Sequence, residues 1–147
     1  KEAYSRAPYF EPTFALLERI VRHPEQNLFR FIHHAIEQTC AYLGIETKIQ
    51  ISSSIAVDHM LKSEDKVLAI CQAVGANVYV NPIGGMDLYS KDTFQQHAIA
   101  LKFIRSNDFE YPQLGNTFVP WLSIVDVLMF NALPDIRRQI HMGFHFI

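Results

Sequence analysis

The sequence predicts an α/β protein with a mostly parallel sheet of at least three strands, helices packed on it in a Rossmann-like three-layer arrangement, and an N-terminal pair of helices. Two apolar patterns at helical spacing open the chain, over residues 12–23 and 27–44. Residues 47–104 then alternate between strand and helix patterns, which is typical of a parallel sheet with right-handed crossovers. The 147 residues, 49% hydrophobic and 19% charged, are enough for one core, so we expect a single domain over residues 1–147.

The predicted strands are short and apolar. Residues 47–55 alternate apolar and polar side chains, and Lys48 and Gln50 suggest that this strand lies at an edge of the sheet. Residues 77–82 form the next predicted strand, which Pro82 ends, and residues 99–104 form the third.

The predicted helices carry end signals. Gly44 is a natural C-cap for the second helix, because glycine readily adopts the left-handed conformation found there. Further helices are predicted over residues 63–76, 90–98, 123–131 and 134–140. The first three of these have a serine in the N-cap position: Ser63, Ser90 and Ser123.

The composition argues against two classes of function, nucleic-acid binding and membrane spanning. The 13 Lys+Arg and 15 Asp+Glu residues give a formal net charge of −2 without a basic stripe, which argues against nucleic-acid binding. No apolar run approaches the ~20 residues of a membrane span. Cys40 and Cys71 are far apart on apolar helix faces, so we expect free thiols in a reducing, cytoplasmic compartment. No cofactor motif is evident.

Three loops are predicted to share one edge of the sheet, because ligands bind beyond the carboxyl ends of parallel strands. The first strand runs into Ser53 and Ser54, with Asp58 and His59 beyond them. The second ends at Asn81 and leads into Gly84 and Gly85, and the third ends at Arg105. Hydroxyls, a glycine backbone, an amide and a guanidinium suit an anionic, hydroxyl-rich ligand such as a sugar phosphate.

Each of these features has a plain structural alternative. The pair Gly84 and Gly85 follows a proline and fits a tight turn as well as it fits a ligand loop. In favour of a ligand loop, the pair leads to the helix that Ser90 caps, whose N-terminus favours anions. The serines at residues 52–54 suit the end of a strand, and Asp58 with His59 fits either a general acid/base pair or a solvated loop.

Two further patterns are interpreted as structural. Ser123 and Asp126 have the S-x-x-D spacing of a variant capping box. His33 with Glu37, and His141 with His145, stand four residues apart, but two ligands do not make a metal site. We therefore predict no metal.

Four stretches, "YSRAPYF", "YVNPIGGMDLY", "EYPQ" and "FVPWLSIVDVLMFN", occur in the order found in a bacterial family. Through them the chain resembles the WbqC-like proteins from about Tyr4 to Asn131. Members of that family open with a Q-P-x-Y-x-P-W type segment that this sequence lacks, so we expect it to be the larger part of a longer WbqC-like protein.

The resemblance implies a role in the biosynthesis of lipopolysaccharide O-antigen and other surface polysaccharides. It suggests a transferase that places an amino-acid or other acyl group on a nucleotide-activated or phosphorylated sugar. Two alternatives stay open: a non-catalytic partner of a glycosyltransferase or of another polysaccharide-biosynthesis enzyme, and a nucleotide-binding domain with adenylate-forming chemistry. The matching polar positions are Ser53, Ser54, Asn81, Gly84, Gly85, Tyr89, Tyr111, Gln113, Ser123 and Asp126.

Roles follow for these positions and their neighbours. Gly84, Gly85 and Arg105 are expected to hold phosphate. Asn81, Tyr89 and Gln113 are expected to bind sugar hydroxyls, with Ser53, Ser54, Tyr111 and Ser123 as further substrate-binding residues. Asp58, His59 and Asp126 are the expected catalytic residues, which would handle protons.

Overall fold

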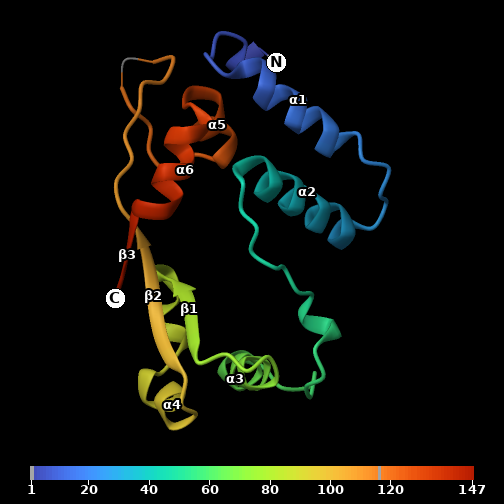
Figure 1. Cartoon of the computed structure of the whole chain (residues 1–147), viewed down its shortest axis with the longest axis vertical. Helices are drawn as coiled ribbons and strands as arrows, with labels where there is room; N and C mark the ends of the chain where they lie inside the picture. The colour runs from blue at the N-terminus through green and yellow to red at the C-terminus, as the bar shows by residue number, and fades with distance from the viewer. Residues whose placement is uncertain (1, 116) are drawn as a thin grey trace. The chain divides into compact units, whose positions relative to one another are not determined.

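The chain forms two compact units in the computed structural model, which describes residues 2–115 and 117–147 (Figure 1). The helical unit comprises the described residues up to 47 together with residues 108–143. The sheet unit comprises residues 48–107 and 144–147. Each unit has a core of its own, so each is described by itself.

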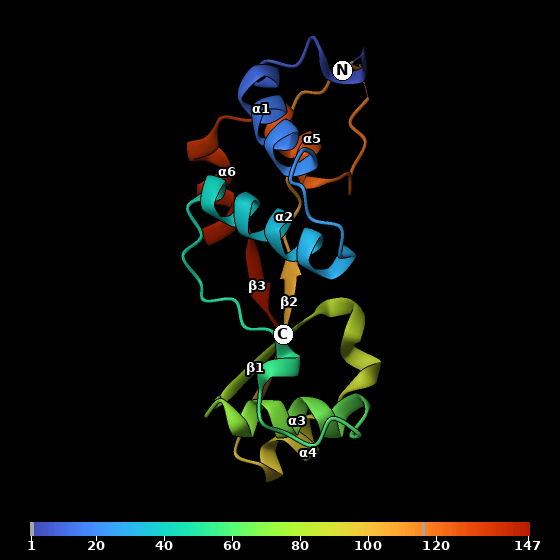
Figure 2. The same ribbon diagram turned by 90° about the vertical axis from the view of Figure 1, so that its right-hand side faces the viewer.

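The helical unit contains four α-helices: α1 (Phe10–Val21), α2 (Leu28–Leu43), α5 (Ile124–Phe130) and α6 (Leu133–Met142) (Figure 2). A short 3-10 turn, Glu2–Tyr4, precedes them. The predicted N-terminal pair is confirmed as α1 and α2. The core of the unit comes from all four helices and consists of Leu16, Ile20, Leu43, Leu128 and Ile136.

Polar contacts fix the helix ends within this unit. The fully buried hydroxyl of Thr13 on α1 donates to the carbonyl of Leu128 on α5 at 2.9 Å. Gly44 ends α2 with φ 75°, which confirms the predicted C-cap. The guanidinium Nε of Arg137 on α6 donates to the carbonyl of Leu43 at 2.8 Å. This cation satisfies a free carbonyl at the negative end of the α2 dipole.

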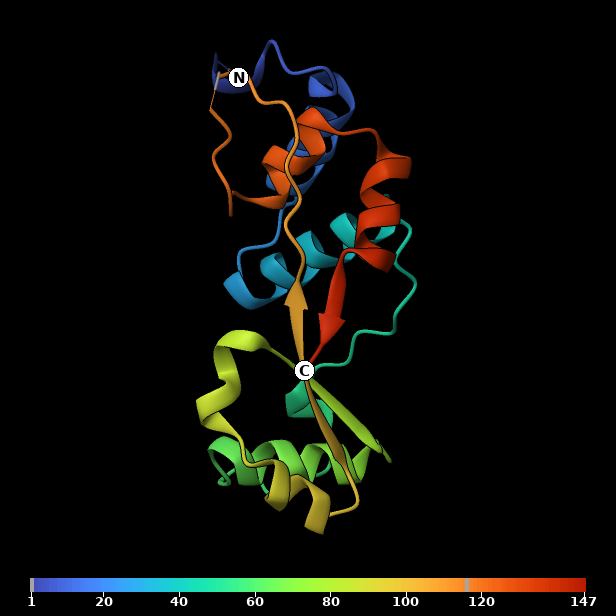
Figure 3. The same cartoon turned by 90° about the vertical axis from the view of Figure 1, so that its left-hand side faces the viewer.

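The sheet unit has three strands in the order β1-β2-β3: β1 (Val78–Pro82), β2 (Ala100–Ser106) and β3 (Phe144–Phe146) (Figure 3). β1 and β2 are parallel, and β2 and β3 are antiparallel. The helices α3 (Ser63–Ala73) and α4 (Lys91–Gln96) complete the unit, with the 3-10 segments η2 (Ser52–Ser54) and η3 (Ile83–Leu88). The predicted strands at 77–82 and 99–104 are thus confirmed.

The strand predicted over residues 47–55 is wrong. Ile49 and Ile51 are 41% and 37% exposed, so the apolar side of the alternation is not buried against a core. Residues 52–54 form η2 instead, where the Ser54 hydroxyl donates to the carbonyl of Ile51 at 2.7 Å. Serine side chains compete in this way with strand pairing. The third strand comes from residues 144–146, at the far end of the sequence.

Within the sheet unit, helices cover one face of the sheet. Leu101 and Phe103 on β2 and Tyr79 on β1 point to this face and pack with Leu68 and Cys71 of α3 and Phe94 of α4. Val78 and Val80, on the opposite face of β1, are 43% and 42% exposed. The unit is therefore a mixed α/β structure of two layers, and the predicted Rossmann-like three-layer arrangement is not found in it.

Two of the three predicted serine caps are confirmed. Ser90 accepts from the Thr93 amide at 3.3 Å and Ser123 accepts from the Val125 amide at 3.2 Å. The prediction for Ser63 is wrong, because Lys62 takes the N-cap position and Ser63 already belongs to α3, with a left-handed φ of 47°.

Candidate functional site

In the sheet unit, the signature segment from Tyr79 to Tyr89 forms a small aromatic and amide cluster. The Tyr79 hydroxyl donates to Asn81 Oδ1 at 3.4 Å and lies 3.5 Å from the Tyr89 hydroxyl. Phe94, which is fully buried, stacks on Tyr79 with ring centroids 5.4 Å apart and meets Tyr89 edge-on at 5.9 Å. The cluster therefore brings together one amide and one phenol from β1 and a second phenol, Tyr89, from the end of the segment that follows it.

The two glycines of this segment differ in their surroundings. Gly85 is buried in η3, and a Cβ at its position would overlap the Asn81 side-chain amide and meet the Tyr89 ring at 3.7 Å. A Cβ on Gly84 would meet no atom within 4 Å. The sequence therefore needs glycine at residue 85 so that Asn81 can lie against the backbone. The backbone at residue 84 is open to approach.

This difference gives a matched pair of variants. We expect Gly85→Ala to lower the free energy of unfolding by about 1–3 kcal/mol, because its methyl group must displace the amide of Asn81. Gly84→Ala is expected to change it by less than about 0.5 kcal/mol, since its methyl group enters open space. Urea unfolding of both variants measures this. Equal losses for both would contradict the tight contact at Gly85.

Part of the predicted edge is confirmed. Because β1 and β2 are parallel, with Pro82 paired to Ile104, Asn81 and Arg105 both lie at the carboxyl edge of this strand pair. Arg105 is exposed there. Ser53 and Ser54 are exposed as well, but they follow no strand, so the predicted set of three strand-end loops reduces to two.

A side chain of the protein itself already accepts a hydrogen bond at the N-terminus of α4. Glu64 Oε2 accepts from the Ser90 amide at 2.6 Å, and the Ser90 hydroxyl accepts from the Thr93 amide in the first turn of α4. A carboxylate thus takes the place that the sequence suggested for an anionic ligand. The exposed backbone at Gly84 and the exposed Arg105 make no such contact with a carboxylate among the hydrogen bonds and ion pairs of the described residues.

Asp58 and His59 lie in an exposed loop. Asp58 Oδ1 accepts from the Met60 amide at 2.9 Å, which makes a local turn, and the His59 carbonyl accepts from Lys66 Nζ at 3.3 Å. These contacts use the Asp58 carboxylate for the turn, and they leave the His59 ring open to solvent.

In the helical unit, a buried carboxylate organises the other predicted residues. Asp126 on α5 is 3% exposed, and its Oδ2 accepts from the Tyr111 hydroxyl at 2.8 Å and from Gln113 Nε2 at 2.9 Å. Gln113 also pairs with the backbone of Val119, donating to its carbonyl at 3.1 Å and accepting from its amide at 2.8 Å. Both amide hydrogens of Gln113 are thus used within the protein.

This arrangement corrects the capping-box interpretation. Ser123 does cap α5, but the Asp126 side chain points into the unit, where it bonds Tyr111 and Gln113. A buried carboxylate is costly unless hydrogen bonds satisfy it, and here two donors from outside its helix do so. Asp126 therefore ties Tyr111 and Gln113 to α5, and Gln113 in turn holds the backbone of Val119.

The buried carboxylate of Asp126 helps to raise the pKa of two tyrosines in the helical unit. Burial, followed by the hydrogen bond and negative charge of Asp126, raises the pKa of Tyr111 to about 12 from an ordinary 10.0. Burial and Asp126 also raise the pKa of Tyr4. Both phenols are therefore held neutral, as hydrogen-bond donors, beyond the pH at which free tyrosine ionises.

Alkaline pH should weaken the folded state through Tyr111. Its folded pKa lies above its unfolded pKa, so the unfolded chain loses this proton first and stability falls as pH rises from 10.0 to about 12. The loss of unfolding free energy due to Tyr111 is about 2–3 kcal/mol, because each pKa unit corresponds to ~1.36 kcal/mol. Urea unfolding measures this. As pH rises from 10.0 to about 12, the free energy of unfolding of the wild type should fall relative to that of Tyr111→Phe. Parallel curves for the two proteins would contradict the assignment.

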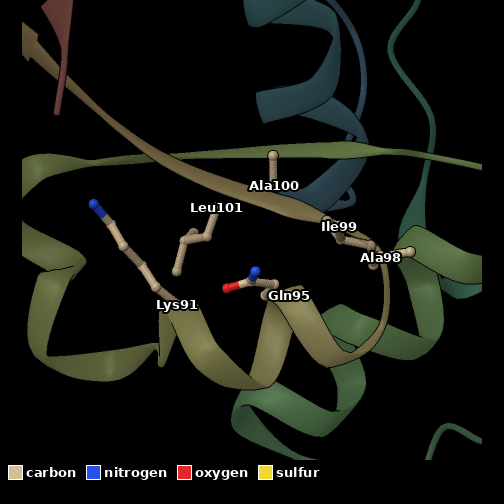
Figure 4. Close-up of a pocket in the computed structure, with 6 residues that line it drawn as sticks. All are labelled: Lys91, Gln95, Ala98, Ile99, Ala100 and Leu101. Carbon is tan, nitrogen blue, oxygen red and sulfur yellow. The ribbon is translucent and has the colours of Figure 1, made fainter.

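A hollow of about 390 Å³ lies where α4 meets the start of β2 (Figure 4). Its lining consists of Lys91, Gln95, Ala98, Ile99, Ala100 and Leu101. It lies at the amino end of β2, whereas Arg105 and Asn81 stand at the carboxyl edge of the strand pair. The candidate site residues predicted from the sequence all lie within the described ranges of the chain. None of them lines this hollow.

Two histidines of the i,i+4 pairs contact polar side chains in the structure. His33 Nδ1 lies 3.3 Å from Glu37 Oε2 on α2, and His145 Nδ1 lies 2.8 Å from Asn107 Oδ1. In residues 2–115 and 117–147, no group of three or more His, Cys, Asp or Glu side chains could hold a metal ion. Cys40 and Cys71 are free thiols.

The sequence comparisons bear on the same segments. A sequence model of the WbqC-like protein family matches residues 1–138, which include both clusters. The chain belongs to the WbqC-like family. A search of curated proteins and a search of solved structures give no match. None of the helices in the described part of this WbqC-like chain is long and apolar enough to cross a membrane.

The sequence patterns did not indicate the parts that Tyr79, Tyr4 and Val119 play in the two clusters. Tyr79 shares the inner face of β1 with Asn81, and the strand alternation could have indicated this pairing. Tyr4 lies within "YSRAPYF", one of the stretches that resemble the family, but its link to Asp126 spans most of the chain. Val119 belongs to the cluster only through its backbone amide and carbonyl, and every residue type except proline has both groups, so the sequence gives no signal for this contact.

Proposed function

We propose that this protein acts in the biosynthesis of bacterial surface polysaccharides such as O-antigen, as a transferase that adds an amino-acid or other acyl group to a nucleotide-activated or phosphorylated sugar in the cytoplasm. The observation that carries the proposal is membership of the WbqC-like family, which is associated with O-antigen and related polysaccharides. The two polar clusters lie in the stretches through which the chain resembles that family.

In the proposal, the carboxyl edge of β1 and β2 binds the phosphates of the activated sugar. The backbone at Gly84 is unobstructed, and the exposed guanidinium of Arg105 stands at the same edge. Arginine pairs with phosphate oxygens through two parallel hydrogen bonds. Asn81 and Tyr89 would then receive sugar hydroxyls, while Gly85 keeps Asn81 in place.

The reaction would be an acyl transfer. A hydroxyl or amine of the sugar attacks the acyl carbon, the new C–O or C–N bond forms, and the bond to the leaving group of the donor breaks. The proton of the attacking group passes to a base and then to the leaving group. We assign this base to Asp58 or His59. Asp126, with both donors already in place, acts instead as a positioning residue for Tyr111 and Gln113.

Calorimetric titration with UDP-glucose, UDP-N-acetylglucosamine and dTDP-glucose tests the phosphate site. We expect saturable binding of at least one of them to the wild type, and Arg105→Gln to weaken it about tenfold, through loss of a charge-assisted contact of roughly 1.4 kcal/mol. Lys102→Gln, on the same strand, is the control and should bind as the wild type does. Absence of binding by all three sugars would refute the proposal.

The second candidate function is that of a non-catalytic partner of another polysaccharide-biosynthesis enzyme. It is favoured by a stripe of exposed apolar side chains on α2, where Leu28, Phe29, Ile32 and Ile36 are between 48% and 72% exposed. Cross-linking in cells that make O-antigen would separate the two functions. Capture of a glycosyltransferase by the wild type but not by Phe29→Asp, with normal polysaccharide in Asp58→Asn/His59→Gln cells, would favour the partner role.

A further inference from the structure

We propose that the indole ring of Trp121, in the helical unit, is a stacking platform for the pyranose ring of a sugar. This inference rests on the proposed function, because it assumes that the protein acts on sugars. It adds a saccharide contact that belongs to the helical unit and does not involve phosphate.

Trp121 is unusual in its exposure and in its backbone. Its side chain is 80% exposed, although tryptophan is among the side chains that gain most from burial. Its φ is 59°, in the left-handed region that a bulky residue rarely adopts. Packing of the ring cannot offset this strain, since the ring is exposed. Residues held in such sparsely populated backbone conformations cluster at ligand-binding and active sites.

The segment before Trp121 is held in a fixed shape. Gln113 pairs with both the amide and the carbonyl of Val119, two residues ahead of the tryptophan, and Gln113 is anchored on the buried carboxylate of Asp126. On the other side, Ser123 caps α5 two residues after the tryptophan. The ring is therefore presented from a chain that is tied down on both sides, which reduces the ordering cost of binding.

The chemistry of the surface fits a sugar ring. A pyranose has an apolar C–H face, which stacks on an aromatic ring, and a rim of hydroxyls that stay in contact with water or polar groups. Val119, two residues before the tryptophan, and Leu122, directly after it, are 51% and 46% exposed, so the same stretch presents further apolar side chains to solvent. No charged residue occurs between Gln113 and Ser123, so this segment offers little to a phosphate group.

Trp121 is the only tryptophan in the sequence, so its fluorescence reports on this position alone. We would titrate the full chain with the methyl glycosides of glucose, galactose, rhamnose and N-acetylglucosamine, and separately with UDP. Saturable quenching or a blue shift by at least one glycoside, without an effect of UDP, is expected. A response to UDP alone would mean stacking on a nucleobase and would overturn the proposal, as would the absence of any response.

Two substitutions separate binding from folding. Trp121→Gly removes the ring and relieves the strained φ, so its melting temperature should equal or exceed that of the wild type. Calorimetry should nevertheless show glycoside binding weakened about tenfold or more. Trp121→Phe keeps an aromatic face and should retain part of the affinity. Glycoside binding by Trp121→Gly with wild-type affinity would refute the role of the ring.

The outcome can be told apart from failure of the proposed function. If a UDP-sugar binds in the calorimetric titration and Arg105→Gln weakens this binding, while the glycosides leave the tryptophan fluorescence unchanged, the Trp121 proposal alone fails. If neither UDP-sugars nor glycosides bind, both fail.

Discussion

Asp126→Ala is expected to lower the free energy of unfolding by about 3–5 kcal/mol, because two hydrogen bonds to a buried carboxylate are each worth about 1.5–3 kcal/mol. The substitution leaves the Tyr111 hydroxyl and one amide hydrogen of Gln113 without their acceptor in a buried place. A loss of this size is a large share of the total stability of a small protein. Urea unfolding followed by far-UV circular dichroism measures it.

Asp135→Ala is the matched control. Asp135 also stands in the first turn of a helix, α6, but its side chain is 54% exposed and pairs with the exposed Arg138 at 3.3 Å. Such a surface pair contributes about 0–1 kcal/mol, so we expect little change in stability. Asp126→Asn, which keeps the size and one acceptor oxygen, should fall between the two. Equal losses for Asp126→Ala and Asp135→Ala would contradict the importance of the buried network.

Phe94→Ala should lower the free energy of unfolding by about 3–5 kcal/mol, as expected for removal of a fully buried aromatic side chain. Phe94 is 0% exposed and contacts the rings of Tyr79 and Tyr89, so the substitution opens a cavity beside both phenols. We also expect the Tyr79 and Tyr89 rings to become more mobile, which near-UV circular dichroism would register as a loss of signal.

The control for this substitution is Phe146→Ala in the same unit. Phe146 is 48% exposed on β3 and packs against Phe144 and beneath the Lys102 ammonium. Its removal should cost about 1 kcal/mol or less, since much of the ring is already in water. If Phe146→Ala were the more harmful of the two, the core of the sheet unit would have to lie elsewhere.

Local patterns in the sequence predicted most elements but not their assembly. The helices and the strands at 78–82 and 100–106 follow from periodicity and from caps such as Ser90 and Gly44. The strand expected at residues 47–55 failed because alternation alone does not provide a partner for the strand. β3 could not be foreseen, because three residues at the end of the sequence are too short to show a period and their partner lies about 40 residues earlier.

The candidate site was predicted in a similar, partial way. The resemblance to the family identified Asn81, Gly85 and Tyr89, which the structure brings together, and the trio of Tyr111, Gln113 and Asp126, which it joins by hydrogen bonds. The S-x-x-D spacing predicted that Asp126 caps its own helix. Its hydrogen-bond partners are instead Gln113 and Tyr111, which lie 13 and 15 residues earlier on a separate segment. Long-range pairing of this kind leaves no local pattern.

We expect an activated sugar to bind at the carboxyl edge of β1 and β2. The most direct measurement is an amide ¹H–¹⁵N spectrum of the labelled chain during titration with UDP-glucose, UDP-N-acetylglucosamine and dTDP-glucose. Binding at this edge should shift the backbone amides of Gly84, Gly85 and Arg105 saturably with at least one of these sugars. Spectra in which these amides stay unchanged with all three sugars, while other amides shift or none do, would contradict it.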